Sequence, residues 1–166
     1  MSDFYQKLTQ GVLIAGGIIA AAPPAWATSF TISSGETVTA AQALVDGETG
    51  LIESGGFLNT TATSITGGGN AVITNNGTIT TTGDSSTGLT PSGSGNVIIN
   101  NGTINTSGVQ ADGLRDSGTN TLFTNNGSII TTGDSAEGIL TTQSDSVYNN
   151  AGLIDTLGDN SVGIIT

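Results

Sequence analysis

The chain of 166 residues contains no cysteine and no histidine. The absence of cysteine excludes a disulfide framework and thiolate-held metals, and the absence of histidine excludes sites that depend on imidazole ligands. Aromatic residues make up 4% of the chain, and Lys7 and Arg115 are its only cations, against 13 acidic residues and a formal net charge of −11. Because almost nothing in the chain can neutralise phosphates, we expect neither nucleic acid nor an anionic membrane surface as a partner.

The composition permits two interpretations of how ordered the chain is. Glycine is abundant, at 26 residues, and Thr, Ser and Asn supply most of the polar positions. Such a composition is compatible with disordered low-complexity sequence. The apolar residues, however, recur at fixed places within a repeat, and this regularity favours an ordered chain that forms one domain.

The first 27 residues contain the three parts of a secretory signal peptide. A polar start carries Lys7, twelve apolar residues follow from Gly11 to Ala22, and two prolines precede the small-residue site Ala25-Trp26-Ala27. Twelve apolar residues are too few for a transmembrane helix, which needs about 20. We therefore predict export through a signal peptide at 1–27, with cleavage after Ala27 and a mature protein that begins at Thr28.

A 25-residue repeat organises the rest of the chain. Its clearest part, NNGTITTTGDSSTGL, begins at Asn75 and returns without gaps as NNGTINTSGVQADGL from Asn100, NNGSIITTGDSAEGI from Asn125 and NAGLIDTLGDNSVGI from Asn150. A fixed period of this size is typical of a solenoid, in which each repeat forms one coil and the coils stack on one another.

Each period contains three apolar segments separated by turns. In the first clear repeat we predict strands at Ala71–Thr74, at Thr78–Thr82 and around Leu89. Stacking the coils would align the equivalent apolar residues, and also the asparagines at 75, 100, 125 and 150 and the threonines at 81, 106, 131 and 156, in inward-facing columns. Glycine marks the corners, where we expect either a positive φ or a close approach of two backbones. An antiparallel sheet with hairpins at the Asn-Gly dipeptides is the alternative, but it does not account for the constant period.

The predicted fold is therefore all-β: a right-handed parallel β-helix (β-solenoid) of about four 25-residue, three-strand coils after an N-terminal cap. Residues 28–66 are interpreted as capping strands and a degenerate first coil, because the terminal unit of a stack must close an open edge. Within this cap, Ala40–Val45 could form a helical turn or an irregular strand. Residues 67–166 are interpreted as the solenoid repeats, truncated in the last coil.

Two groups of residues are candidates for chemistry. Asp84, Asp134 and Asp159 share one turn position, which Val109 interrupts, and stacked carboxylates could hold Ca²⁺. Because this column is broken, we interpret the three as solvated turn aspartates. In the second group, Arg115 lies between Asp112 and Asp116, and paired carboxylates could serve a glycosidase. With no aromatic residue nearby in the sequence, we interpret this group as repeat-turn residues that form a surface ion pair of little energetic value.

The A-x-A signal, the lead-in SSGETVTAAQALVDGETGLIESGG and the repeated N-N-G-T-I…T-G-D-x-x-x-G-[LI] pattern together resemble the passenger region of bacterial autotransporters, the type V secreted surface proteins. This resemblance covers essentially the whole chain. It implies a β-helical passenger that is exported and displayed outside the cell by a C-terminal outer-membrane barrel. The chain carries no barrel-like run of strands after its repeats, so we interpret it as the N-terminal part of a longer protein or a truncated gene product.

The resemblance and the repeats lead to one main hypothesis of function. The chain is expected to be a non-enzymatic, cell-surface or secreted adhesin or display stalk, with host-cell surface, extracellular matrix or polysaccharide as partners. The alternative is a β-helical polysaccharide-degrading enzyme whose active-site loops lie beyond residue 166. On either hypothesis, we assign no catalytic, cofactor-binding or metal-ligating residue in this chain.

Overall fold

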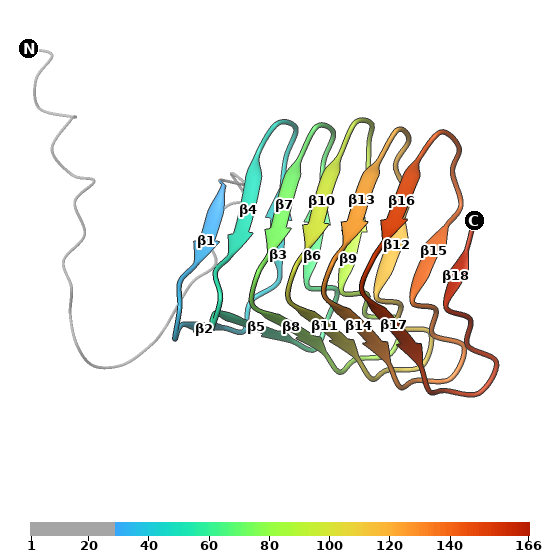
Figure 1. Cartoon of the computed structure of the whole chain (residues 1–166). Coiled ribbons are helices and arrows are strands. Elements are labelled where there is room, and N and C mark those ends of the chain that lie inside the picture. Colours follow the sequence, from blue (N-terminus) through green and yellow to red (C-terminus); the bar gives the residue numbers. More distant parts are fainter. Residues whose placement is uncertain (1–28) are drawn as a thin grey trace, which may run out of the picture.

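The computed structural model describes residues 29–166, and in that range the chain forms 18 strands and no helix. The strands fall into three six-stranded sheets, here named sheets A, B and C, which enclose one core along the whole length of the described chain (Figure 1). The predicted signal peptide at residues 1–27 lies outside the described residues.

The strands rotate through the three sheets in chain order, so that each coil contributes one strand to each sheet. Sheet A contains β1 (Phe30–Ile32), β4 (Thr49–Ile52), β7 (Val72–Asn75), β10 (Val97–Asn100), β13 (Leu122–Asn125) and β16 (Val147–Asn150). Sheet B contains β2 (Thr37–Val38), β5 (Phe57–Thr60), β8 (Thr78–Thr81), β11 (Thr103–Thr106), β14 (Ser128–Thr131) and β17 (Leu153–Thr156). Sheet C contains β3 (Gln42–Leu44), β6 (Ile65–Gly67), β9 (Leu89–Pro91), β12 (Leu114–Asp116), β15 (Ile139–Thr141) and β18 (Ile164–Ile165).

Neighbouring strands within the three sheets run parallel, and the constant period sets their register. Ile104 of β11 lies opposite Ile79 on one side and Ile129 on the other, so each partner is 25 residues away. The antiparallel hairpin interpretation is therefore wrong. In Figure 1 the chain descends along sheet A, crosses through sheet B and rises along sheet C while it advances, which makes the coil right-handed, as parallel crossovers nearly always are. The predicted parallel β-solenoid is confirmed.

The segment predicted as a cap forms two full coils, β1–β3 and β4–β6, which are shorter than the later ones. Phe30 pairs with Gly50, only 20 positions on. Tight turns shorten these coils: at Gly35 and Gly55 the backbone has φ near +80°, which glycine adopts at no steric cost. Of the two alternatives for Ala40–Val45, the strand is confirmed and the helical turn is wrong, because this stretch contains β3 and pairs in sheet C.

Apolar columns inside the coil form the core, with one principal column behind each sheet. Behind sheet B, Ile79, Ile104 and Ile129 have no exposed surface. The corresponding core positions behind sheets A and C are Ile73, Ile98 and Phe123, and Leu89, Leu114 and Ile139. A coil holds too few apolar residues for a core of its own, but each buried isoleucine contributes about 1.5–3 kcal/mol once neighbouring coils cover it. The stacking of coils, rather than any single coil, therefore stabilises the fold.

Polar columns run beside the apolar ones, as the repeat predicts. Asn75 donates from its side-chain amide to Asn100 Oδ1 at 2.8 Å, and Asn100 donates in the same way to Asn125 at 2.7 Å. The ladder ends with Asn125 donating to Asn150 at 2.7 Å. Thr81 is also buried, and its hydroxyl donates to the backbone carbonyl of Ser86 at 2.7 Å. The predicted inward asparagine and threonine columns are confirmed.

The repeating glycines lie at corners where two coils touch through their backbones. A Cβ atom at Gly102 would collide with the carbonyl oxygen of Gly77, and one at Gly127 would collide with that of Gly102. Positive φ is found instead at non-glycine turn positions of the clear repeats, namely Ser85, Gln110, Ser135 and Asn160. Of the two reasons expected for glycine at the corners, close backbone approach is therefore the one that holds at these positions.

Candidate functional site

The turn aspartates are exposed and bind backbone rather than one another. Asp84 Oδ1 accepts the backbone N–H of Val109 at 3.0 Å, and Asp134 Oδ1 accepts that of Asp159 at 3.0 Å. Each of these carboxylates thus caps a peptide group at the same turn position of the next coil. Among residues 29–166, no three acidic side chains come together in an arrangement that could hold a metal ion. Asp84, Asp134 and Asp159 are thus exposed at their shared turn position.

The structure joins Arg115 to Asp112 but separates both from Asp116. Arg115 projects outward from β12, and its Nε donates to Asp112 Oδ2 at 2.7 Å. The Asp112 side chain has no exposed surface, whereas the Arg115 side chain keeps 39% of its surface exposed. The predicted surface ion pair is therefore wrong for its acidic member, because the stacked coils cover Asp112. A buried carboxylate that lost its cation would be strongly destabilising, unlike an exposed one.

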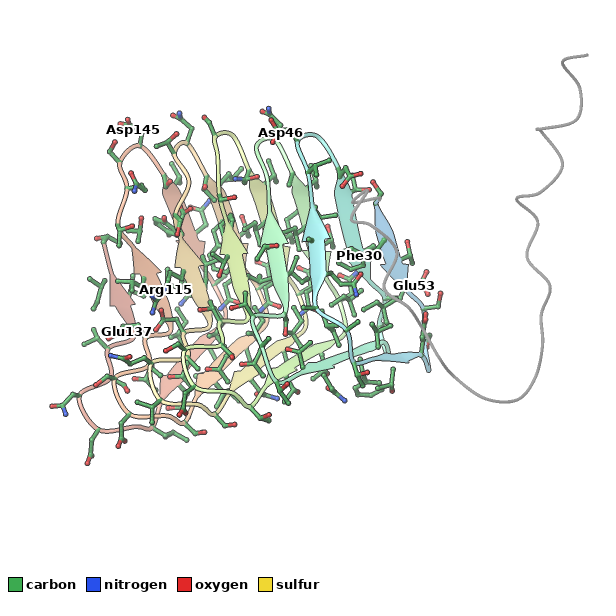
Figure 2. All side chains as sticks on the ribbon, turned by 180° about the vertical axis from the view of Figure 1, so that it is seen from behind. Phe30, Asp46, Glu53, Arg115, Glu137 and Asp145 are labelled. Atoms are coloured by element: carbon green, nitrogen blue, oxygen red, sulfur yellow. The ribbon has the colours of Figure 1, made fainter. Side chains whose placement is uncertain are left out.

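Glu137 completes this cluster, and the sequence did not single it out. It occupies the position of Asp112 one coil further on, and its backbone N–H donates to Asp112 Oδ1 at 2.9 Å. Burial raises the pKa of the Glu137 carboxyl above the ordinary 4.5, and the hydrogen bond and negative charge of Asp112 raise it further. The positive charge of Arg115, which lies beside Glu137 in Figure 2, opposes this shift and lowers the pKa of Glu137. The 25-residue spacing alone could have revealed this pair of carboxylates.

Glu137→Gln is expected to change how stability depends on pH. Because the folded state raises the pKa of Glu137, folding favours its protonated form; the associated stability is present below pH 4.5 and is lost as pH rises through the folded pKa. The glutamine side chain of the variant does not titrate, so the variant does not lose this stability. Its free energy of unfolding relative to that of the unsubstituted protein should therefore increase as the pH rises from 4 to 7. Urea-unfolding midpoints at both pH values measure the difference. The exposed Asp145→Asn variant controls for the loss of one negative charge, and an equal gain in both variants would contradict the prediction.

Asp116 is the last residue of β12, and it points into the coil rather than standing in a turn as predicted. It is fully buried, and its Oδ1 accepts the backbone N–H of Gly118 at 2.9 Å and the hydroxyl of Thr121 at 3.1 Å. Its Oδ2 accepts the hydroxyl of Tyr148 at 2.5 Å. The carboxylate is thus satisfied by three donors, which lowers the cost of burying its charge. This enclosed arrangement leaves no open side on which a substrate could approach Asp116.

The outer surface differs between the sheets in charge and polarity. None of the six strands of sheet A contains a charged residue, and this sheet carries a row of exposed or half-exposed apolar side chains at Val72, Val97, Leu122 and Val147. The outward row of sheet B is mostly polar and runs through Thr80 and Asn105. Acidic side chains gather at the corners, where Figure 2 shows Asp46 and Asp145 pointing outward between sheets C and A. Sheet A therefore presents an uncharged face with one apolar row, and the acidic side chains of the molecule lie mostly at the corners between sheets.

The fold defines the chain as a β-solenoid protein, built from three parallel sheets around one core. No family model, curated protein or solved structure matches it. No helix long and apolar enough to cross a membrane occurs in residues 29–166.

Proposed function

We propose that this chain is a non-enzymatic β-solenoid that acts as an adhesin or display stalk at the cell surface or in secreted form, as in an autotransporter passenger. The observation that carries the proposal is the continuity of the three sheets. Each has six hydrogen-bonded strands in one unbroken order. Because every coil is bonded to its neighbours through all three sheets, the described chain is a rigid stack of coils, and such a stack is suited to holding a surface away from a cell.

The uncharged face of sheet A supports a role in contact with another surface. Val72, Leu122 and Val147 are 38%, 41% and 53% exposed and lie in one row along the stack of coils. Monomeric soluble proteins tend to limit contiguous exposed apolar area, and larger patches mark interaction sites. The acidic corners would disfavour anionic partners by repulsion, so the partner proposed here is an uncharged surface of a host cell, matrix protein or polysaccharide.

The polysaccharide-degrading alternative gains no support from the carboxylates that it would use. Asp112 and Asp116 are both fully buried, and the carboxylate of each is hydrogen-bonded to another side chain, Asp112 to Arg115 and Asp116 to Tyr148. A glycosidase needs two carboxylates that flank an open sugar-binding cleft. We therefore keep the non-enzymatic function as the proposal.

A binding assay with paired variants tests the contact role. The secreted protein is incubated with immobilised glycans and matrix proteins, and bound protein is quantified. Val97→Lys and Leu122→Lys place charge on the face of sheet A, whereas Thr80→Lys and Asn105→Lys do so on sheet B as matched controls. At least tenfold weaker binding for the sheet A variants alone is expected. Equal loss in both pairs, or release of sugar fragments, would overturn the proposal.

Export is tested separately from binding. The full chain is expressed in a Gram-negative host, and its mature N-terminus is sequenced from the exported fraction. The proposal expects Thr28 as the first residue, and expects Leu13→Arg, which places a charge in the apolar run, to retain the protein inside the cell. An exported protein that still begins at Met1 would contradict the cleaved signal peptide.

A further inference from the structure

We propose that Asp116, Thr121 and Tyr148 form a register lock, a buried contact that fixes the order in which the near-identical coils stack. This inference goes beyond the proposed function, because it concerns how a repetitive chain selects one fold. It rests on the hydrogen bond between Asp116 and Tyr148, 32 residues apart, which joins one turn of the solenoid to the next.

Repetition creates the problem that such a lock would solve. Strand β11 pairs with β14 in the native stack, so that Ile104 lies opposite Ile129 and Asn105 lies opposite Ile130. If one coil were skipped, β11 would meet β17, and Ile104 would lie opposite Ile154. Isoleucine would still face isoleucine, and the asparagine and threonine columns would also still match. The repeated columns therefore discriminate poorly between the native stack and a stack displaced by one coil.

The Asp116–Tyr148 contact departs from this repetition. Asp116 ends β12, from which the chain turns into β13, and Tyr148 lies beside Phe123 on the neighbouring strand β16. The 2.5 Å hydrogen bond therefore spans one repeat plus seven residues, from one turn of the solenoid to the next. The other two donors to Asp116, Gly118 N–H and Thr121 Oγ1, come from the segment that leads from β12 into β13. One buried carboxylate thus ties the corner after β12 to strand β16 of the following turn.

Neither partner of this contact has an equivalent elsewhere in the repeats. The position of Tyr148 is taken by Ile73, Ile98 and Phe123 in the earlier repeats, and the position of Asp116 is taken by Pro91 and Thr141 in the coils on either side. The Tyr148 ring lies against Phe123, with centroids 6.5 Å apart and planes tilted by 57°. Aromatic packing therefore helps to position the hydroxyl over Asp116.

A displacement by one coil would break this contact. Strands in a sheet are about 4.8 Å apart, so a skipped coil would move the Tyr148 hydroxyl by roughly that distance relative to Asp116. The carboxylate would remain buried but would lose a donor, which is far more costly than losing an exposed hydrogen bond. Burial and the Asp116 hydrogen bond also raise the Tyr148 pKa above its ordinary 10.0, so the hydroxyl remains a donor at neutral pH. Only the native order of coils satisfies this group.

Disulfide trapping can measure the register directly, because the chain has no cysteine. Asn105→Cys with Ile130→Cys reports the native stack, since these positions are paired neighbours. Asn105→Cys with Asp155→Cys reports a skipped coil, since in the native stack Asp155 lies one further strand away, opposite Ile130. Two strand spacings, about 9.6 Å, exceed the Cα separation that a disulfide can bridge. Each pair is introduced into the full chain, which is then refolded from denaturant and oxidised.

Tyr148→Phe removes only the hydroxyl and is the variant that tests the lock. We expect it to raise the 105–155 disulfide yield at least tenfold and to lower the 105–130 yield. Ile104→Val, which weakens the core without touching the lock, controls for lower stability and should leave both yields unchanged. If Tyr148→Phe does not refold, Thr121→Val removes a different donor to Asp116 and tests the same lock. Unchanged yields in the variant that refolds, or an equal rise in Ile104→Val, would overturn the proposal.

Discussion

Asn100→Ala is expected to lower the free energy of unfolding by about 2 to 5 kcal/mol. The Asn100 side chain is fully buried; it accepts from Asn75 at 2.8 Å and donates to Asn125 at 2.7 Å. Alanine would leave the Asn75 amide with only its weaker contact to the Thr103 carbonyl, at 3.2 Å, and would leave Asn125 Oδ1 without its donor. Because water cannot replace these partners inside the coil, the desolvation cost of both groups appears as lost stability. The midpoint of urea unfolding measures it.

The adjacent residue provides a matched control for the buried ladder. Asn101 donates to Asn76 at 2.9 Å and accepts from Asn126 at 2.9 Å, so it forms the same kind of ladder on the outside of the same corner. Its side chain is exposed, and water can replace both partners. Asn101→Ala should therefore change the free energy of unfolding by less than about 0.5 kcal/mol. Similar losses in the two variants would contradict the argument that burial, rather than the hydrogen bond itself, determines the cost.

Gly127→Ala is expected to lower the free energy of unfolding by about 3 kcal/mol or more. A Cβ atom at Gly127 would meet the backbone of the preceding coil, with the Asn101 carbonyl carbon at 2.8 Å and the carbonyl oxygen of Gly102 nearer still. Backbone atoms held in three sheets cannot rotate away as a flexible side chain can. The two coils must therefore separate at this corner, which weakens the Asn126 N–H bond to the Asn100 carbonyl, at 2.8 Å. Thermal and urea unfolding followed by circular dichroism measure the loss.

Gly163→Ala is the control for the glycine substitution. At Gly163 the nearest atom to a Cβ would be Ile154 Cγ2 at 3.8 Å, an ordinary van der Waals distance, and the backbone φ is not positive. Alanine there restricts the unfolded chain without straining the folded one, so stability should stay unchanged or rise by up to about 1 kcal/mol. A comparable loss of stability in both variants would show that the conformational preference of alanine, and not contact between coils, explains the destabilisation by Gly127→Ala.

The period of 25 residues by itself predicted most of the architecture. Gap-free spacing places like residues one above another, so parallel pairing, three sheets and the inward columns of isoleucine, asparagine and threonine all follow from it. The same spacing contained the Asp112–Glu137 pair, which aligns one coil to the next. The N-terminal coils were less predictable, because their shorter spacing, from Phe30 to Gly50, departs from the period and the repeat no longer identifies equivalent positions.

Only the tertiary structure decided which polar residues are inside and which coils they connect. Asp112 and Asp116 are short-range neighbours of Arg115 in sequence, yet stacking buries both and directs Asp116 towards Tyr148, 32 residues on. Sequence patterns report two regular features: the alternation of inward and outward side chains along a strand, and the repetition of residue types from coil to coil. The reach of the Tyr148 side chain to Asp116 on the preceding turn, the close approach of two backbones at Gly102, and the gathering of uncharged strands on one face depend on distances in three dimensions. Those distances arise only when all the coils are stacked, because no single coil can bury a core alone.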